Sequence, residues 1–241
     1  MRLRNFALIL LCNFLGVYLF FSWYMTAYNG FWFTIDKQIF YFFNQLIAQS
    51  SLFMYFVAAT NYRAFDLVAF AAMLAIFYSY YGRADAEGKR FLFCIGVAML
   101  VSAVLAKQLS RYLPIVRASA SVYFDALNHN VAFVSELSGW AVKDRSGDSF
   151  PGDHGMMLMI FAAYMWRYLG TGAFAKGLGV LIIFSLPRFM SGAHWFTDVA
   201  VGSVSVALVV LSWLLLTPIS DIFIGWLKEK VPLGLFLPKK L

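Results

Sequence analysis

The sequence contains few charged residues and few residues that break helices or cross-link chains. Asp, Glu, Lys and Arg make up only 13% of its 241 residues, whereas hydrophobic residues make up 62%. This balance excludes an ordinary soluble domain of this length, in which about 25% of residues are charged. The chain has only six prolines and two cysteines. Cys12 and Cys94 lie in different apolar segments, so neither a disulfide nor a metal-binding spacing is predicted.

Long apolar segments dominate the chain instead. A membrane-spanning helix needs about 20 mostly apolar residues. The segments found here are solidly apolar rather than alternating, which argues against a β-barrel. We therefore predict an all-α, polytopic membrane protein in which residues 1–241 form a single six-transmembrane-helix bundle. The expected spans are Phe6–Tyr24, Asp66–Tyr81, Phe91–Ser110, Pro151–Tyr168, Gly172–Arg188 and His194–Thr217.

The first span has an alternative interpretation as a signal peptide, but its length and the lack of a small-x-small cleavage site favour an uncleaved helix. The segment Thr34–Gln49 has a different character, with apolar residues at helical spacing beside polar ones. It predicts an outer interfacial helix, which is either a connector or a wall that guides a lipid headgroup. The residues expected to form its apolar face are Ile35, Ile39, Phe42, Phe43 and Leu46.

The distribution of Lys and Arg predicts the orientation of the bundle. With both termini in the cytoplasm, most of the 19 basic residues fall on the inner side, including Arg2, Lys239 and Lys240. The longest polar stretch, Arg111–Phe150, then faces outward. The net charge of +7 reflects this anchoring, and no basic-aromatic motif indicates binding of nucleic acid.

Two of the three histidines lie in short polar islands at the ends of predicted spans, where polar groups are costly and usually functional. His194 and Asp198 are four residues apart, so on a helix they share one face. The aspartate can then hold one imidazole nitrogen and leave the other free to attack. His154 follows Pro151 and Gly152 at the start of a helix, where free backbone N–H groups bind anions, and it is placed to donate a proton.

Several cations converge on the same side of the predicted bundle. The guanidinium of Arg188 suits a phosphate, and a turn after this residue would return the chain toward His194. An isolated His or Arg near a span end usually packs or snorkels, whereas this combination indicates a phosphate-handling site. The alternative of a transporter would place ionisable groups near the bilayer midplane. The other cations of the cluster are Lys107, Arg111 and Arg117.

His129 has no comparable cluster of charged residues around it and is predicted to be a surface residue.

Two motifs resemble signatures of the type 2 phosphatidic acid phosphatase superfamily. They are Pro151-Gly152-Asp153-His154 and Arg188-x5-His194-x3-Asp198. The resemblance implies that His194 is a phosphoryl-accepting nucleophile assisted by Asp198, that His154 is the general acid, and that no metal or other cofactor is needed. It also implies a phosphate site built from Arg188, Arg117, Lys107, Arg111, Gly152 and Asp153. The first motif of the family is incomplete, because Ser110 stands where a Lys is usual, and either Lys107 or Arg111 is expected to take the place of that Lys.

Within this superfamily the chain is most similar to phosphotransferases that modify lipid A in Gram-negative inner membranes. The likeness includes the segments 40–45, 63–66 and 192–198, and the Pro-Gly-Asp-His form of the second motif. It implies transfer of a phosphate from undecaprenyl pyrophosphate to the 1-phosphate of lipid A on the periplasmic side. The alternative is an undecaprenyl pyrophosphatase or another lipid phosphatase that uses water as the acceptor. The named residues do not decide between the two, and no protein partner is predicted.

Overall fold

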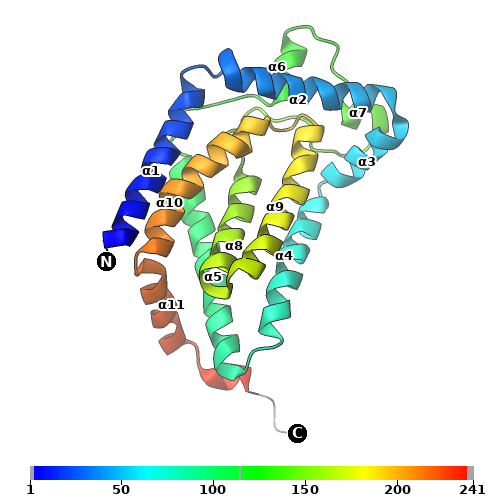
Figure 1. Cartoon of the computed structure of the whole chain (residues 1–241). Helices are drawn as coiled ribbons and strands as arrows, with labels where there is room; N and C mark the ends of the chain where they lie inside the picture. Colours follow the sequence, from blue (N-terminus) through cyan, green and yellow to red (C-terminus); the bar gives the residue numbers. More distant parts are fainter. Residues whose placement is uncertain (1–2, 114, 238–241) are drawn as a thin grey trace.

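The structure is a computed structural model that describes residues 3–113 and 115–237, and this part of the chain is helical without a β-sheet (Figure 1). The predicted all-α class is therefore confirmed. The helices are α1 (Leu3–Tyr24), α2 (Gly30–Gln49), α3 (Ser51–Asn61), α4 (Phe65–Tyr81), α5 (Ala86–Ser110), α6 (Ala120–Ala126), α7 (Val134–Ser138), α8 (Asp153–Leu169), α9 (Thr171–Met190), the π-helical segment η1 (Asp198–Ser203), α10 (Val204–Leu216), α11 (Ile219–Lys230) and the 3₁₀ turn η2 (Leu233–Phe236).

The chain is a multi-pass membrane protein. Within residues 3–113 and 115–237, four helices are long and apolar enough to cross a bilayer, namely α1, α5, α9 and the continuous η1–α10. Large apolar side chains such as Phe14, Leu74 and Ile182 are exposed on the helices, as expected for surfaces that face lipid. The helices α4 and α8 have 17 residues each and reach only about 25 Å. The count of six spans therefore stays a prediction.

The long helices run side by side, with α8 packed against α5, α9 and α10. The helix α1 packs on α10, and α11 folds back against α5. Figure 1 shows α2 lying across one end of the bundle, whereas α11 and the beginning of α1 lie at the opposite end. The outer end of α5 and the beginnings of α4, α8 and η1 all lie toward the α2 end. The histidine motifs are therefore gathered at one end of the bundle.

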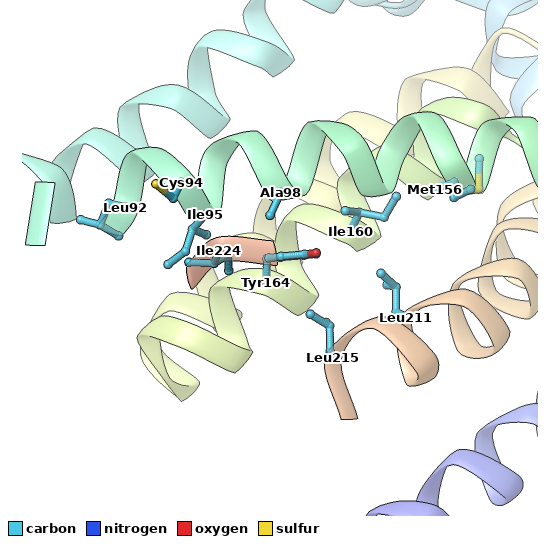
Figure 2. Packing of buried hydrophobic residues seen from close by; sticks show 11 residues of the cluster. Leu92, Cys94, Ile95, Ala98, Met156, Ile160, Tyr164, Leu211, Leu215 and Ile224 are labelled. Atoms are coloured by element: carbon cyan, nitrogen blue, oxygen red, sulfur yellow. The ribbon is translucent and has the colours of Figure 1, made fainter. Parts of the chain in front are cut away.

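The largest core cluster joins α5, α8, α10 and α11 along the interior of the bundle. Figure 2 shows its side chains, which interdigitate between the helices. The Tyr164 hydroxyl lies between Ser102 Oγ at 2.7 Å and Ser220 Oγ at 3.0 Å, which satisfies three buried polar groups at once. The labelled members are Leu92, Cys94, Ile95, Ala98, Met156, Ile160, Tyr164, Leu211, Leu215 and Ile224. Cys94 is buried here, and both cysteines are free.

The predicted interfacial helix is present as α2, but its buried face differs from the expected one. Asp36, Phe40, Asn44 and Ile47 are the buried residues, and they recur at intervals of three or four. Asn44 is satisfied by both backbone groups of Ala132, at 2.9 and 3.1 Å. Two polar residues of α2 therefore find partners inside the protein, while the apolar face expected from the sequence lies on other positions of the helix and stays a prediction.

The contact between α8 and α9 is close because Gly177 has no side chain. A Cβ at this position would lie 2.8 Å from Ala162 Cα, and small residues at helix interfaces allow such approach in membranes. We expect Gly177→Val to lower the free energy of unfolding by about 1–3 kcal/mol through overpacking. Thermal denaturation in detergent measures this loss.

Gly179→Val is a matched control in the same helix, because no atom of the described part of the chain lies within 4 Å of a Cβ at that position. It changes helix propensity in the same way without creating a clash. If both variants lost equal stability, helix propensity rather than interhelical packing would explain the effect.

Candidate active site

A pocket of about 620 Å³ opens at the α2 end of the bundle. It is rich in charged side chains, although it lies against membrane-embedded helices. Of the predicted site residues, it contains both histidines together with three of the four cations and Asp153. The charged residues and histidines that line it are Asp66, Lys107, Arg111, Lys143, Arg145, Asp148, Asp153, His154, Arg188 and His194.

His194 lies in the turn that precedes the last span rather than inside the helix. Its Nδ1 is 3.0 Å from the Ser149 carbonyl oxygen and 3.2 Å from Asp198 Oδ2. Because both neighbours are acceptors, Nδ1 carries the proton, and Nε2 keeps a free lone pair. The predicted start of this span at His194 was wrong, but the predicted contact with Asp198 is present.

The turn that carries His194 needs a glycine at position 192. Gly192 has φ +73°, and a Cβ there would lie 2.8 Å from the Phe40 ring. The His194 amide then donates to the Arg188 carbonyl at 3.2 Å. The chain thus turns sharply between Arg188 and His194, as the sequence predicts, and returns the imidazole to the end of α9.

Asp198 is fully buried behind His194. Its Oδ2 also accepts a hydrogen bond from the Trp195 amide at 2.9 Å, and its Oδ1 accepts one from Arg117 Nη1 at 2.9 Å. Every contact of this carboxylate is with a donor, which favours the charged form. Asp198 is therefore suited to orient the imidazole and to stabilise a positive charge on it.

Arg117 does not reach the pocket, contrary to the prediction that it binds phosphate. Only 1% of it is exposed, and its Nη2 lies 2.8 Å from Asp36 Oδ2. The guanidinium also lies 4.2 and 5.1 Å from the ring centroids of Trp195 and Trp23. Because its two terminal nitrogens bind two buried carboxylates and indoles cover its faces, Arg117 stabilises Asp198 instead of binding substrate.

Asp36 and Thr197 complete this buried group, and neither was predicted from the sequence as a site residue. Asp36 accepts hydrogen bonds from the Thr197 amide at 3.0 Å and the Thr197 hydroxyl at 2.5 Å. Burial raises the pKa of Asp36, whereas Arg117 and Thr197 oppose that rise. An aspartate on the buried face of an amphipathic helix is the signal that would have revealed it. The hydrogen bonds of Asp36 with Thr197 connect α2 to the segment that follows His194.

Arg188 remains beside the pocket, at the end of α9. It is 6% exposed and forms an ion pair with Asp66 at the beginning of α4. His154 Nδ1 lies 4.0 Å from the same Asp66 oxygen, so Arg188 and His154 lie on either side of one carboxylate. Lys143 Nζ contacts the other oxygen at 2.5 Å. Asp66 and Lys143 were not predicted, although a charged residue at the start of an apolar span is a usable signal.

The remaining predicted phosphate ligands have different surroundings. Lys107 and Arg111 line the pocket, and Lys107 Nζ lies 3.1 Å from Asp153 Oδ2. Asp153 is thus the partner of a cation rather than a phosphate ligand, because its own negative charge repels phosphate.

The prediction that Gly152 binds phosphate was also wrong. Its amide donates to the Ser149 carbonyl at 3.2 Å, and its position packs against Val199 and Ser203.

His129 lies away from the pocket in the outer loop, where its Nδ1 contacts the Tyr41 hydroxyl. Among the described residues, no three His, Cys, Asp or Glu side chains are grouped as ligands of a metal would be. The chemistry that the arrangement itself offers is nucleophilic attack by a neutral imidazole on a group held by arginine and lysine. A tetrahedral anion fits this combination of charges.

Comparison with known proteins agrees with this chemistry. A model of the PAP2 superfamily matches residues 89–221, which is more than half of the chain. Lipid A 1-diphosphate synthase from Escherichia coli (strain K12) is 46% identical over 231 residues, covering 95% of this chain and 96% of the relative. No solved structure shows a significant match. Both histidine motifs fall within the region that the family model matches, and the chain belongs to the PAP2 superfamily of phosphatases and phosphotransferases.

Proposed function

We propose that this enzyme transfers a phosphate group from undecaprenyl pyrophosphate to the 1-phosphate of lipid A. The products are lipid A 1-diphosphate and undecaprenyl phosphate. The observation that carries the proposal is the 46% identity, over 95% of the chain, to a lipid A 1-diphosphate synthase. The pocket supports it, because its cations suit phosphate groups and it lies at the end of membrane-embedded helices.

In the first step, His194 Nε2 attacks the terminal phosphorus of the donor, and a phosphorus–nitrogen bond forms as the bond to the bridging oxygen breaks. His154 donates a proton to that leaving oxygen. Asp198 holds the Nδ1 proton and stabilises the charged imidazole. Arg188, Lys107 and Arg111 offset the negative charge of the transferring phosphoryl group.

In the second step, an oxygen of the acceptor phosphate attacks the phosphohistidine. The phosphorus–nitrogen bond breaks, and the neutral imidazole of His194 is restored. If water attacks instead, the same residues perform hydrolysis. Exclusion of water from the phosphoenzyme is therefore what separates a transferase from a phosphatase.

We place the enzyme in the bacterial inner membrane as a single domain, with the pocket facing the periplasm and both termini in the cytoplasm. The Lys and Arg distribution supports this orientation. The described ends of the chain, at the beginning of α1 and just after η2, lie at the end of the bundle opposite α2 (Figure 1). Of the inner basic residues, Arg2, Lys239 and Lys240 lie outside the described residues.

The test uses purified protein in vesicles with undecaprenyl pyrophosphate labelled in its terminal phosphate. We expect the label to appear on lipid A when this acceptor is present, and only slow release of phosphate when it is absent. Chromatographic separation of labelled lipid from free phosphate measures both. Release of phosphate at the full rate without lipid A would reject transfer and favour the hydrolase.

A further inference from the structure

Two cations of the pocket come from the outer loop rather than from a family motif. Lys143 and Arg145 both line the pocket beside Arg188 and the two histidines. Their side chains are 46% and 45% exposed, so both are open to a ligand. Neither is used in the donor half of the proposed mechanism.

The segment that carries these cations is held in place by several contacts. Val142 pairs with Tyr62 in an isolated antiparallel bridge, and the Lys143 amide donates to the Asn61 carbonyl at 3.1 Å. Asp144, between the two cations, is 3% exposed, and its Oδ2 accepts from the Ser135 amide at 2.7 Å. Burial alternates along this segment. An inward Asp144 therefore leaves Lys143 and Arg145 on the outward side.

The shortest ion pairs of both cations are with exposed carboxylates that an anionic ligand can replace, although Arg145 Nε also lies 3.9 Å from Oδ1 of the buried Asp144. Lys143 contacts Asp66, whose side chain is 36% exposed, and Arg145 contacts Glu136, whose side chain is 64% exposed. Exposed ion pairs of this kind contribute at most about 1 kcal/mol. The Arg145 guanidinium also lies 3.7 Å from the ring centroid of Phe133, which favours one orientation of its planar group.

The position of Lys143 relative to Arg188 gives these cations a role in transfer. One oxygen of Asp66 contacts Arg188 and the other contacts Lys143. The two cations are therefore separated by a single carboxylate group. An anion bound by Lys143 would lie next to an anion bound by Arg188. Transfer between two phosphates requires this adjacency.

We propose that Lys143 and Arg145 form a second anion site, which binds the phosphate monoester of the acceptor lipid. This inference rests on the proposed phosphotransferase function. Arg188 and the cations at the end of α5 lie at helix ends, where a lipid chain within the bilayer delivers its phosphate. The 143–145 segment lies in the loop beyond those ends, which suits a phosphate carried by a large polar headgroup. A guanidinium and an ammonium together match its charge and geometry.

The test separates the two half-reactions in vesicles that contain the full-length enzyme. Formation of phosphohistidine from labelled undecaprenyl pyrophosphate is followed without acceptor. Transfer of the label is then followed at increasing concentrations of lipid A. For Lys143→Gln/Arg145→Gln we expect the KM for lipid A to rise about tenfold or more, as for the loss of a charge-assisted hydrogen bond. Phosphohistidine formation should fall far less, which also shows that the variant is folded.

Two further variants sharpen the result. Lys143→Arg/Arg145→Lys keeps both charges and should recover much of the acceptor affinity. Arg63→Gln is a matched control, because Arg63 is an exposed cation of the outer side that does not line the pocket. It should leave both half-reactions as in the natural enzyme.

An unchanged KM for lipid A in the double variant would overturn the second site. So would an equal loss of phosphohistidine formation and of transfer, because the cations would then bind the donor. If the unmodified enzyme itself released phosphate without transferring it to lipid A, the proposed function would fail first. The failure of each proposal is therefore recognisable by itself.

Discussion

Replacing His194 with alanine is expected to reduce phosphoryl transfer to about 10⁻⁴ of the natural rate or less, because the attacking nitrogen is lost. The imidazole is the group whose Nδ1 is held by the Ser149 carbonyl and Asp198, which leaves its Nε2 free to attack. The measurement is steady-state transfer from labelled undecaprenyl pyrophosphate. Trapping of acid-labile phosphoenzyme should give no signal for the variant.

His154→Ala serves as the comparison. It removes the general acid but not the nucleophile, so its rate should fall by about 10²- to 10⁴-fold while some phosphohistidine still forms. Near-normal turnover by His194→Ala, or phosphoenzyme in that variant, would overturn the assignment of the nucleophile.

Replacing Arg117 with alanine is expected to cost stability as well as activity. Its guanidinium neutralises two buried carboxylates, Asp36 at 2.8 Å and Asp198 at 2.9 Å. Removing one partner of a buried ion pair typically costs about 3–5 kcal/mol, since the other charge is left uncompensated. We expect a large fall in the midpoint of thermal denaturation in detergent, together with loss of phosphohistidine formation because Asp198 no longer holds the imidazole.

A second substitution distinguishes this role from phosphate binding. Asp36→Asn in the Arg117→Ala background removes one of the stranded negative charges, so part of the lost stability should return. A phosphate ligand would behave differently. If Arg117→Ala kept the natural stability and only raised the KM of the donor, Arg117 would contact substrate, as the motif resemblance implied.

The helices were predictable because their signals are local. An apolar run of a given length predicts a span wherever it lies in the chain, and the ends of α4 and α5 at Tyr81 and Ser110 agree with the predicted ones. The buried face of α2 was not predictable in this way. Which side of an amphipathic helix is buried depends on what packs against it, and Asp36 and Asn44 have their partners in segments far along the chain.

The candidate site likewise combines features that were predictable from local spacing with features that depend on tertiary packing. The spacing of His194 and Asp198 predicted their contact, although the imidazole comes from a turn rather than from the helix. The incomplete first motif misassigned Arg117, and Gly152 and Asp153 were assigned by their place in the second motif. Lys143 and Asp66 were overlooked, since their importance arises only where the outer loop meets the beginning of α4.

By itself, the sequence determined that this protein is a helical membrane enzyme with a histidine–aspartate pair at one end of its bundle. Apolar runs and close spacings in a helix act within a few residues, so they can be read along the chain. Only the tertiary structure decided which cations face the pocket and which are neutralised inside the protein. Arg117 meets Asp36 and Asp198 across 81 positions in each direction. The strength of such a buried charge pair depends on burial and geometry that exist only in the folded state.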